Sequence, residues 1–119
     1  MDFQTAIKTC FSKYGDFTGR AQRAEYWWFV LFWFGVLALL NLLQLEAVAG
    51  IFSLVILIPS IAVAVRRLHD VGMSGWWYLL VLVPLLGMLV LLYFFIQRGE
   101  SGTNKYGPDP LADPETRPT

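Results

Sequence analysis

Three long stretches without any charged side chain limit the fold of this chain more than any other feature of its sequence. They cover residues 26–43, 47–65 and 76–96, and they are 18, 19 and 21 residues long. In helical form the shortest is about 27 Å long, close to the roughly 30 Å of a bilayer's hydrocarbon layer. Hydrophobic residues make up 56% of the 119-residue chain and the mean hydropathy is +0.53, which is more apolar surface than a small soluble domain can bury. The sequence therefore predicts an all-α membrane protein with three transmembrane helices.

Residues 2–14 show the pattern of an amphipathic helix ahead of the first apolar run. Apolar side chains from Phe3 to Tyr14 recur at spacings of three and four, polar side chains fill the other face, and Gly15 is a natural helix end. Beside a membrane anchor such a helix suits the plane of the interface, but the same apolar face can also pack on the protein's own spans. The first 25 residues lack the apolar core and cleavage site of a signal peptide, so we expect the first apolar run to remain in the mature protein.

Two prolines interrupt the apolar runs. Pro59 leaves the carbonyl of Val55 without its helical partner, so we expect a kink there, with Ser60 or a neighbouring group satisfying that carbonyl. Pro84 and Gly87 lie near the middle of the third run. A single kinked helix is the commoner arrangement, but a break or a re-entrant hairpin at these residues stays open, since each half alone is too short to cross a bilayer.

The basic residues predict an orientation in the membrane. Six of them precede the first run or lie between the second and third, against three in the C-terminal segment. The positive-inside rule then places the N-terminus in the cytoplasm and, with three spans, the C-terminal segment outside. A hairpin at Pro84 would bring that segment back to the cytoplasm. From residue 97 the density of Gly and Pro predicts turns, and we expect a disordered tail over 111–119 after a single membrane domain over 1–110.

Charged residues gather in two segments that flank the apolar runs, and we expect these segments to form one layer at the cytoplasmic interface. The layer consists of Arg20, Arg23, Glu25, Arg66, Arg67, His69 and Asp70. Guanidinium groups match the geometry of phosphate, so such a layer can bind anionic lipid head groups or a phosphorylated ligand. The alternative is a set of ordinary flanking arginines that snorkel to the interface. Asp70 follows two arginines by three and four residues, so on a helix it neutralises one of them and leaves the other free.

Catalytic and metal-binding interpretations of these residues lack the partners that they need. His69 beside Asp70 suggests a general base with its orienting carboxylate, but adjacent helical residues do not face each other. No serine, cysteine or second histidine is placed to complete a mechanism, so a structural or interfacial histidine is favoured. The single cysteine, Cys10, cannot form an internal disulfide, and one cysteine with one histidine is too few for a zinc site. The net charge of zero argues against bulk nucleic-acid binding, and we expect no metal, cofactor or nucleic acid.

Two tryptophan pairs and a glycine-rich turn complete the expected interface. Each pair follows an arginine-bearing segment, where an aromatic belt belongs, which places both pairs at the same membrane face. The pairs are Trp27 with Trp28 and Trp76 with Trp77. Gly72 and Gly75 fit a tight turn between the second and third spans.

Four motifs, in this order along the chain, resemble the signature of a known family. They are GRAQRAEYWW over 19–28, RRLHD over 66–70, SGWW over 74–77 and NKYGPDP over 104–110. The family consists of small bacterial inner-membrane proteins and is catalogued as domain of unknown function 805; the resemblance extends from about Phe3 to Pro110.

This resemblance implies a multi-pass protein of the bacterial inner membrane, and it implies no activity. The last motif supplies four further residues that we expect to have structural roles. They are Asn104, Tyr106, Pro108 and Asp109. The connection over 44–46 is shorter than in many members of the family, which argues against a function carried by that loop.

The leading functional hypothesis is a non-enzymatic membrane module. Through the charged layer it would bind membrane lipids by their head groups, a partner membrane protein, or a second copy of itself as a homo-oligomer. The rival is a small transporter or channel subunit that acts as an oligomer, based on Pro59 and Pro84 near mid-membrane. Against this rival, no ionisable residue lies inside a predicted span, and such residues usually mark ion paths.

Overall fold

The computed structural model describes residues 1–111, and all of its regular elements there are helical. The elements are α1 (Phe3–Ser12), α2 (Arg23–Leu42), α3 (Glu46–Asp70), the 3₁₀ helix η1 (Gly75–Leu82) and α4 (Leu86–Ile96). No strand forms among these described residues, where one isolated bridge joins Asn104 to Gly107. The all-α prediction is therefore confirmed, while the disordered tail predicted over 111–119 lies, except for Leu111, outside the described part of the chain.

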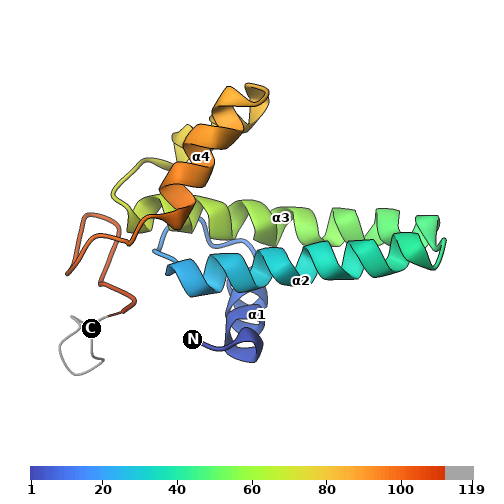
Figure 1. The fold of residues 1–119 in the computed structure, drawn as a ribbon. Helices are drawn as coiled ribbons and strands as arrows, with labels where there is room; N and C mark the ends of the chain where they lie inside the picture. Colours follow the sequence, from blue (N-terminus) through green and yellow to red (C-terminus); the bar gives the residue numbers. More distant parts are fainter. Residues whose placement is uncertain (112–119) are drawn as a thin grey trace.

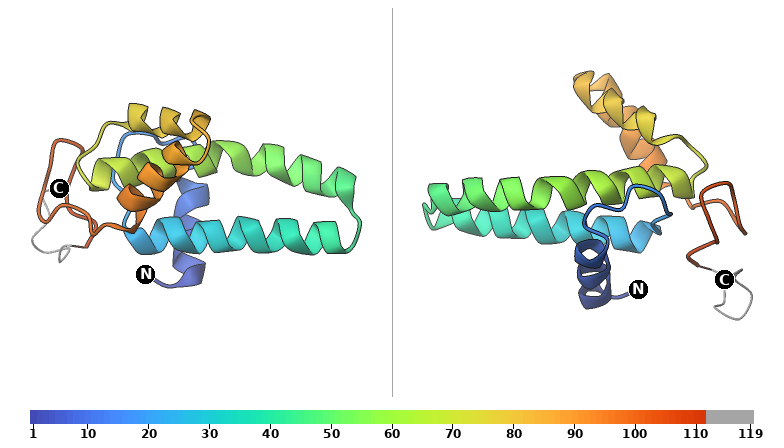
Figure 2. Two further views of the ribbon diagram at one scale, coloured as in Figure 1. Left: turned by 45° about the horizontal axis from the view of Figure 1, so that its top comes forward. Right: turned by 180° about the vertical axis from the view of Figure 1, so that it is seen from behind.

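α2 and α3 form a long antiparallel pair that is the frame of the molecule (Figure 1, Figure 2). With 20 and 25 residues, both are long and apolar enough to cross a membrane. They include most of the first two predicted spans, 26–43 and 47–65, and extend beyond them at the charged end. The connection between them is tight, with a φ of 59° at Gln44, and a connection this short makes the two helices neighbours.

The third apolar run is not one helix. η1 and α4 contact each other as a hairpin that leaves the α2–α3 pair and returns to it, in yellow and orange in Figure 1. The chain reverses just after Pro84, where Leu85 has a φ of 61°. Gly87 permits the close packing of the two arms, because a side-chain carbon there would overlap the Leu80 carbonyl.

Neither arm of this hairpin can cross a bilayer, since each is only about 16 Å long. The prediction of three transmembrane helices is therefore not confirmed. The structure shows instead the alternative that the sequence left open, a break at Pro84 and Gly87. As a result, the segment after α4 returns to the end of the molecule where α2 begins and α3 ends.

α1 lies across α2 rather than along it (Figure 1). Its apolar face is used within the protein, because Ala6 and Cys10 are buried. Phe3 contacts Trp28 edge to face at a ring-centroid distance of 5.7 Å, and the Trp28 indole donates to the Met1 carbonyl at 3.3 Å. A helix at the predicted place therefore exists and packs on α2, while its amphipathic, interfacial role stays a prediction.

Pro59 lies inside α3, which continues through it. The carbonyl of Val55, which Pro59 leaves without a helical partner, accepts a hydrogen bond from the Tyr14 hydroxyl. The group that satisfies the interrupted backbone is thus a side chain from the segment before α2, rather than the adjacent Ser60. This contact anchors the end of α1 to the middle of α3, at a position where hydrocarbon would offer no hydrogen-bond partner.

Candidate functional site

Five charged residues form a buried ion network where α2, α3, the connector between α1 and α2, and the segment after α4 meet. The network consists of Arg20, Glu25, Arg66, Arg67 and Asp70. None of them is more than 6% exposed. We call this end of the α2–α3 pair the network end, and the opposite end, around residues 43–45, the loop end.

Asp70 is the centre of the network. Its Oδ1 accepts from Arg20 Nε at 2.9 Å, and its Oδ2 accepts from Arg67 Nη1 at 2.5 Å. Its backbone carbonyl accepts the N–H of Glu100 at 2.7 Å. Gly99 allows the chain to pass this closely, since a side-chain carbon there would overlap the Asp70 carboxylate. One residue thus joins the connector, the end of α3 and the segment after α4.

A second ion pair joins α2 to α3. Glu25 Oε2 accepts from Arg66 Nη1 at 2.8 Å, while Arg66 Nε donates to the Asp16 carbonyl at 3.1 Å. The expectation that Asp70 would leave one arginine free is wrong, because the remaining arginine finds Glu25 on the neighbouring helix. Among the described residues, Arg66 Nη2 is the one buried side-chain nitrogen or oxygen without a hydrogen-bond partner.

Side chains from α2 and α3 hold the C-terminal end of α4. Arg67 Nε and Trp27 Nε1 both donate to the Phe95 carbonyl, at 3.4 and 3.1 Å, and Arg23 Nη1 donates to the Ile96 carbonyl at 3.2 Å. The last carbonyls of a helix have no partner within it and carry the negative end of its dipole. Two arginines and an indole satisfy both requirements, and they fix the return arm of the hairpin to the α2–α3 pair.

The network contains one positive charge more than its two carboxylates neutralise, and backbone carbonyls accept the remaining donors. Arg20 donates to the carbonyls of Glu100 and Gly102 at 2.5 and 2.6 Å. Arg67 donates to the Gln97 carbonyl. Hydrogen bonds from charged donors are the strong ones in a protein interior, so the segment after α4 is held largely through its main chain.

His69 has a structural environment at the edge of the network. Its Nδ1 lies 2.9 Å from the Gly19 carbonyl, which can only accept, so Nδ1 carries the proton. The imidazole stacks on the Tyr106 ring, with centroids 3.9 Å apart and planes 1° from parallel. The His69 carbonyl accepts from Asn104 Nδ2 at 3.0 Å. Two residues of the NKYGPDP motif therefore fasten the C-terminal segment to the last turn of α3.

The rest of that motif shapes the segment itself. Asp109 Oδ2 accepts the N–H of Gly102 at 3.0 Å, and its Oδ1 accepts that of Leu111 at 2.9 Å. Slight burial alone would raise the pKa of Asp109, but these two hydrogen bonds outweigh it and lower the pKa. Pro108 is exposed.

Of the two glycines predicted for the turn between α3 and η1, Gly72 lies in it and Gly75 is the first residue of η1. Gly72 has a φ of 81°, a conformation that favours glycine. Gly75 faces the Val65 side chain, whose Cγ1 would lie 2.8 Å from a side-chain carbon added at Gly75. Trp76 and Trp77 follow on η1 and are 78% and 44% exposed, as suits an aromatic belt.

Cys10 lies beside the network, with its Sγ 4.0 Å from the Glu25 carbonyl. Burial, supported by the negative charge of Glu25, raises the pKa of the Cys10 thiol to about 12. A thiol with this pKa is almost entirely protonated near neutral pH and is a poor nucleophile.

Asp16, in the connector, has a lowered pKa because the hydroxyl and N–H of Thr18 donate to its carboxylate.

Sequence reasoning missed the backbone partners of the network. The carbonyls of Asp16, Gln97, Glu100 and Gly102, and the close approach at Gly99, have no signal in local spacing, since each is brought to the network by the path of a loop. The glycines after α4 are the only hint in the sequence, and by themselves they predict turns rather than a close approach to Asp70.

The comparison with known families agrees with the motifs that build this site. The family described as "Protein of unknown function (DUF805)" matches residues 14–108. The chain belongs to this family. Its relatives in Escherichia coli K12 include "Inner membrane protein YhaI", 46% identical over 103 residues that cover 82% of this chain and 87% of the relative. "Inner membrane protein YhaH" is 42% identical over 112 residues, covering 85% and 92%. No solved structure matches the chain.

Membership of this family confirms the resemblance stated from the four motifs. The matched region includes every residue of the ion network, from the connector to Asp70, and most of the C-terminal segment that the network holds.

Proposed function

We propose that this DUF805 protein is a multi-pass protein of the bacterial inner membrane, in which α2 and α3 cross the bilayer and the η1–α4 hairpin enters it only part-way. The relatives YhaI and YhaH are named inner membrane proteins. In this topology the loop end lies on one side of the membrane, and all other segments outside the bilayer lie on the opposite side. All eight lysines and arginines of residues 1–111 are then on that side and none is at the loop end, which supports a cytoplasmic network end more strongly than three spans would.

A reporter fused after Thr119 tests this topology. With two spans and a hairpin, the C-terminus lies in the cytoplasm. A reporter that works only in the cytoplasm should then be active in this fusion, and a reporter that works only outside should be silent. The reverse result would contradict the topology and restore three spans. A fusion truncated after Gln44 serves as the control, because it should report the outside in either case.

We infer further that the protein is not an enzyme and binds anionic lipid head groups at its network end. The observation that supports this inference is the division of its basic residues. Arg20, Arg66 and Arg67 are buried and bonded within the protein. Arg23, Arg98 and Lys105 remain exposed around them, as a basic rim at the level expected for head groups.

The head-group function is tested with the two outer members of this rim. Replacing both, Arg98→Gln with Lys105→Gln, removes two exposed charges, each of which contributes about 1 kcal/mol of attraction to an anionic surface. The variant purified from native membranes should therefore carry several-fold less anionic phospholipid. The charge-preserving exchange Arg98→Lys with Lys105→Arg is the matched control and should keep the wild-type lipid composition. Equal anionic lipid in all three proteins would contradict the function.

A further inference from the structure

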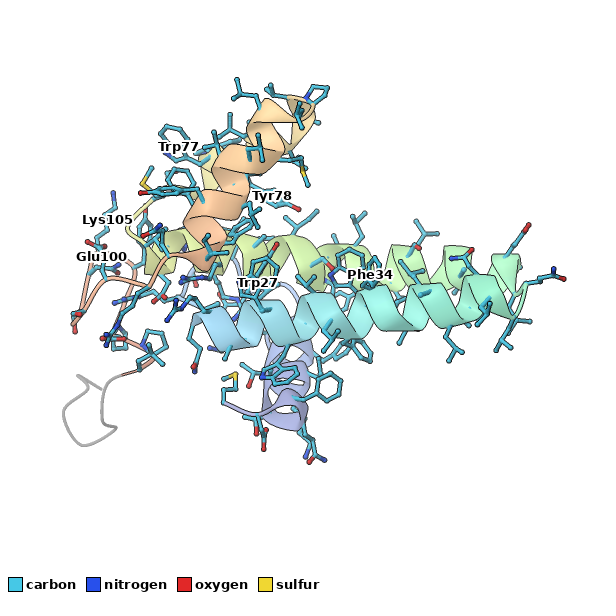
Figure 3. All side chains as sticks on the ribbon, in the orientation of Figure 1. Trp27, Phe34, Trp77, Tyr78, Glu100 and Lys105 are labelled. Atoms are coloured by element: carbon cyan, nitrogen blue, oxygen red, sulfur yellow. The ribbon has the colours of Figure 1, made fainter. Side chains whose placement is uncertain are left out.

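A cleft lies between α2 and the hairpin, and its lining includes none of the basic-rim residues of the proposed function. It has a volume of about 330 Å³ and is lined by aromatic and aliphatic side chains of α2, η1 and α4. Figure 3 shows Trp27 of α2 and Tyr78 of η1 in the angle between the hairpin and the α2–α3 pair. A cavity of this size is at the lower end of the range for ligand sites.

Two tyrosine hydroxyls distinguish this cleft from an ordinary gap between apolar elements. Tyr26 of α2 and Tyr78 of η1 both line it. Within residues 1–111 neither hydroxyl makes a hydrogen bond, and neither is fully enclosed. An unpaired hydroxyl in an apolar environment is unfavourable, and a hydrogen-bond acceptor beside it removes this penalty. The cleft therefore suits a ligand that supplies hydrogen-bond acceptors.

A positive charge lies beside the cleft, outside its lining, on the side of the network. Arg23 precedes Trp27 by one helical turn on the same face of α2, and its Nη1 donates to the Ile96 carbonyl, next to the cleft residue Phe95. Only one of its donors is bonded among the described residues, and the side chain is exposed. The cleft thus has a cationic side chain beside one end, two tyrosines in its lining and an otherwise apolar lining.

This order of groups matches the order of groups in a phospholipid. Tyr26 and Tyr78 each lie three residues after the start of their element, roughly 5 Å deeper than the first residue of that element. The ester oxygens of a phospholipid lie just below its phosphate, and its acyl chains continue into the hydrocarbon.

We propose that the cleft binds one acyl chain of a membrane phospholipid, with ester oxygens accepting from Tyr26 and Tyr78 and the phosphate facing Arg23. This proposal rests on the proposed membrane function. A helix from a second copy fits less well, because a helix is about 10 Å wide and its own carbonyls are already bonded within it.

The test measures phospholipid bound to the full chain in mild detergent, by native mass spectrometry during titration with dioleoyl-phosphatidylglycerol. The wild-type chain should bind one molecule tightly. Val81→Trp fills the cleft and should weaken this binding at least tenfold, whereas Leu82→Trp, at a neighbouring position that is 75% exposed and outside the cleft, should bind like the wild type.

Two conservative changes keep the test valid if the larger side chain disturbs the hairpin. Tyr26→Phe and Tyr78→Phe should each weaken binding about fivefold, whereas Tyr93→Phe, which removes an exposed hydroxyl from α4, should have no effect. Arg23→Gln should reduce the preference for dioleoyl-phosphatidylglycerol over dioleoylglycerol about fivefold. Binding as tight as in the wild type by Val81→Trp, or by the Tyr26→Phe/Tyr78→Phe double variant, would overturn the proposal. A dimer that forms when the phospholipid dissociates would also overturn it, because a second copy would then occupy the cleft.

The failure of this proposal can be told from failure of the head-group function. If Val81→Trp binds like the wild type while the Arg98→Gln/Lys105→Gln variant loses anionic lipid, only the cleft proposal is overturned. If Val81→Trp loses the single phospholipid while the double rim variant keeps its anionic lipid, the cleft proposal stands and the rim function is overturned.

Discussion

The two ends of the α2–α3 pair are stabilised by different interactions. At the network end the interior is polar, and Arg66 and Arg67 have no exposed surface. From the loop end to about the first third of α3 the exterior is apolar, with Leu42 79% exposed and Leu54 72% exposed. A water-soluble protein has the opposite arrangement, apolar inside and polar outside. In the proposed topology hydrocarbon solvates this apolar exterior, whereas directed hydrogen bonds and ion pairs determine the structure of the network end.

This comparison predicts that substitutions of equal size have unequal effects at the two ends. A buried charge that loses its partner costs several kcal/mol, whereas exposed positions tolerate change.

Asp70→Leu should cause the largest loss of stability, because it removes the partner of two buried arginines at once. We expect the free energy of unfolding to fall by about 3–5 kcal/mol or more. Thermal unfolding in detergent, followed by the amount of protein that remains helical, measures it. The control is Glu46→Leu in the first turn of α3 at the loop end, where the exposed carboxylate should be replaceable within about 0.5 kcal/mol. Equal losses would remove the distinction between the two ends.

Gly87→Ala should destabilise the hairpin by about 1–3 kcal/mol, since the added methyl group overlaps the Leu80 carbonyl and the two arms must separate. Gly50→Ala is the matched control, because a methyl group there meets no atom within 4 Å and alanine favours a helix. Protection of the hairpin amides from hydrogen exchange is the measurement. Unchanged protection in Gly87→Ala would show that the arms are not packed as described.

The predictability of the fold from sequence differs along the chain for a physical reason. α2 and α3 follow from the length and uniform apolar character of their segments, which are local properties. The reversal after Pro84 does not, because it depends on the backbone of Leu85 and on the docking of the α4 terminus by Arg23, Arg67 and Trp27. Pro84 and Gly87 marked where a break was possible, but local sequence cannot tell a kink from a hairpin that distant side chains hold.

The candidate site shows the same division. The spacing of Asp70 from Arg67 is local, and it predicts that Asp70 neutralises either Arg66 or Arg67. The pairing of Glu25 with Arg66 joins residues 41 positions apart and needs the α2–α3 register, which spacing does not supply. Carbonyl acceptors such as that of Glu100 leave no trace in side-chain chemistry at all.

Tyr14→Phe should cost about 1 kcal/mol, because it leaves the Val55 carbonyl of α3 without a partner. Chemical denaturation in mixed micelles can resolve a difference of this size. Tyr93→Phe, at an exposed position of α4, should leave stability unchanged. If both variants match the wild type, the carbonyl that Pro59 leaves unpaired is satisfied by another group.

The smallest expected effect concerns the reactivity of the Cys10 thiol, which can be measured without any substitution. The pKa of its thiol rises from 9.0 to about 12 on folding, so at pH 8 the thiolate fraction is about a thousandfold lower than for an ordinary thiol, and maleimide should not label the folded protein. The unfolded chain loses the thiol proton near pH 9, whereas the folded chain keeps it to about pH 12. Between these values the folded state binds more protons than the unfolded state, so the free energy of unfolding should decline as the pH rises. Rapid labelling at pH 8 would show that α1 is not packed on α2.

The central claim is that the protein neutralises its arginines internally, and a double-mutant cycle on Glu25 and Arg66 tests it most directly. Glu25→Leu alone should destabilise by about 3–5 kcal/mol, since it leaves Arg66 buried and unpaired. Glu25→Leu combined with Arg66→Met should recover most of that loss, because an apolar pair replaces the ion pair. If the two single effects simply add in the double variant, Arg66 is not neutralised by Glu25, and the account of the network end is contradicted.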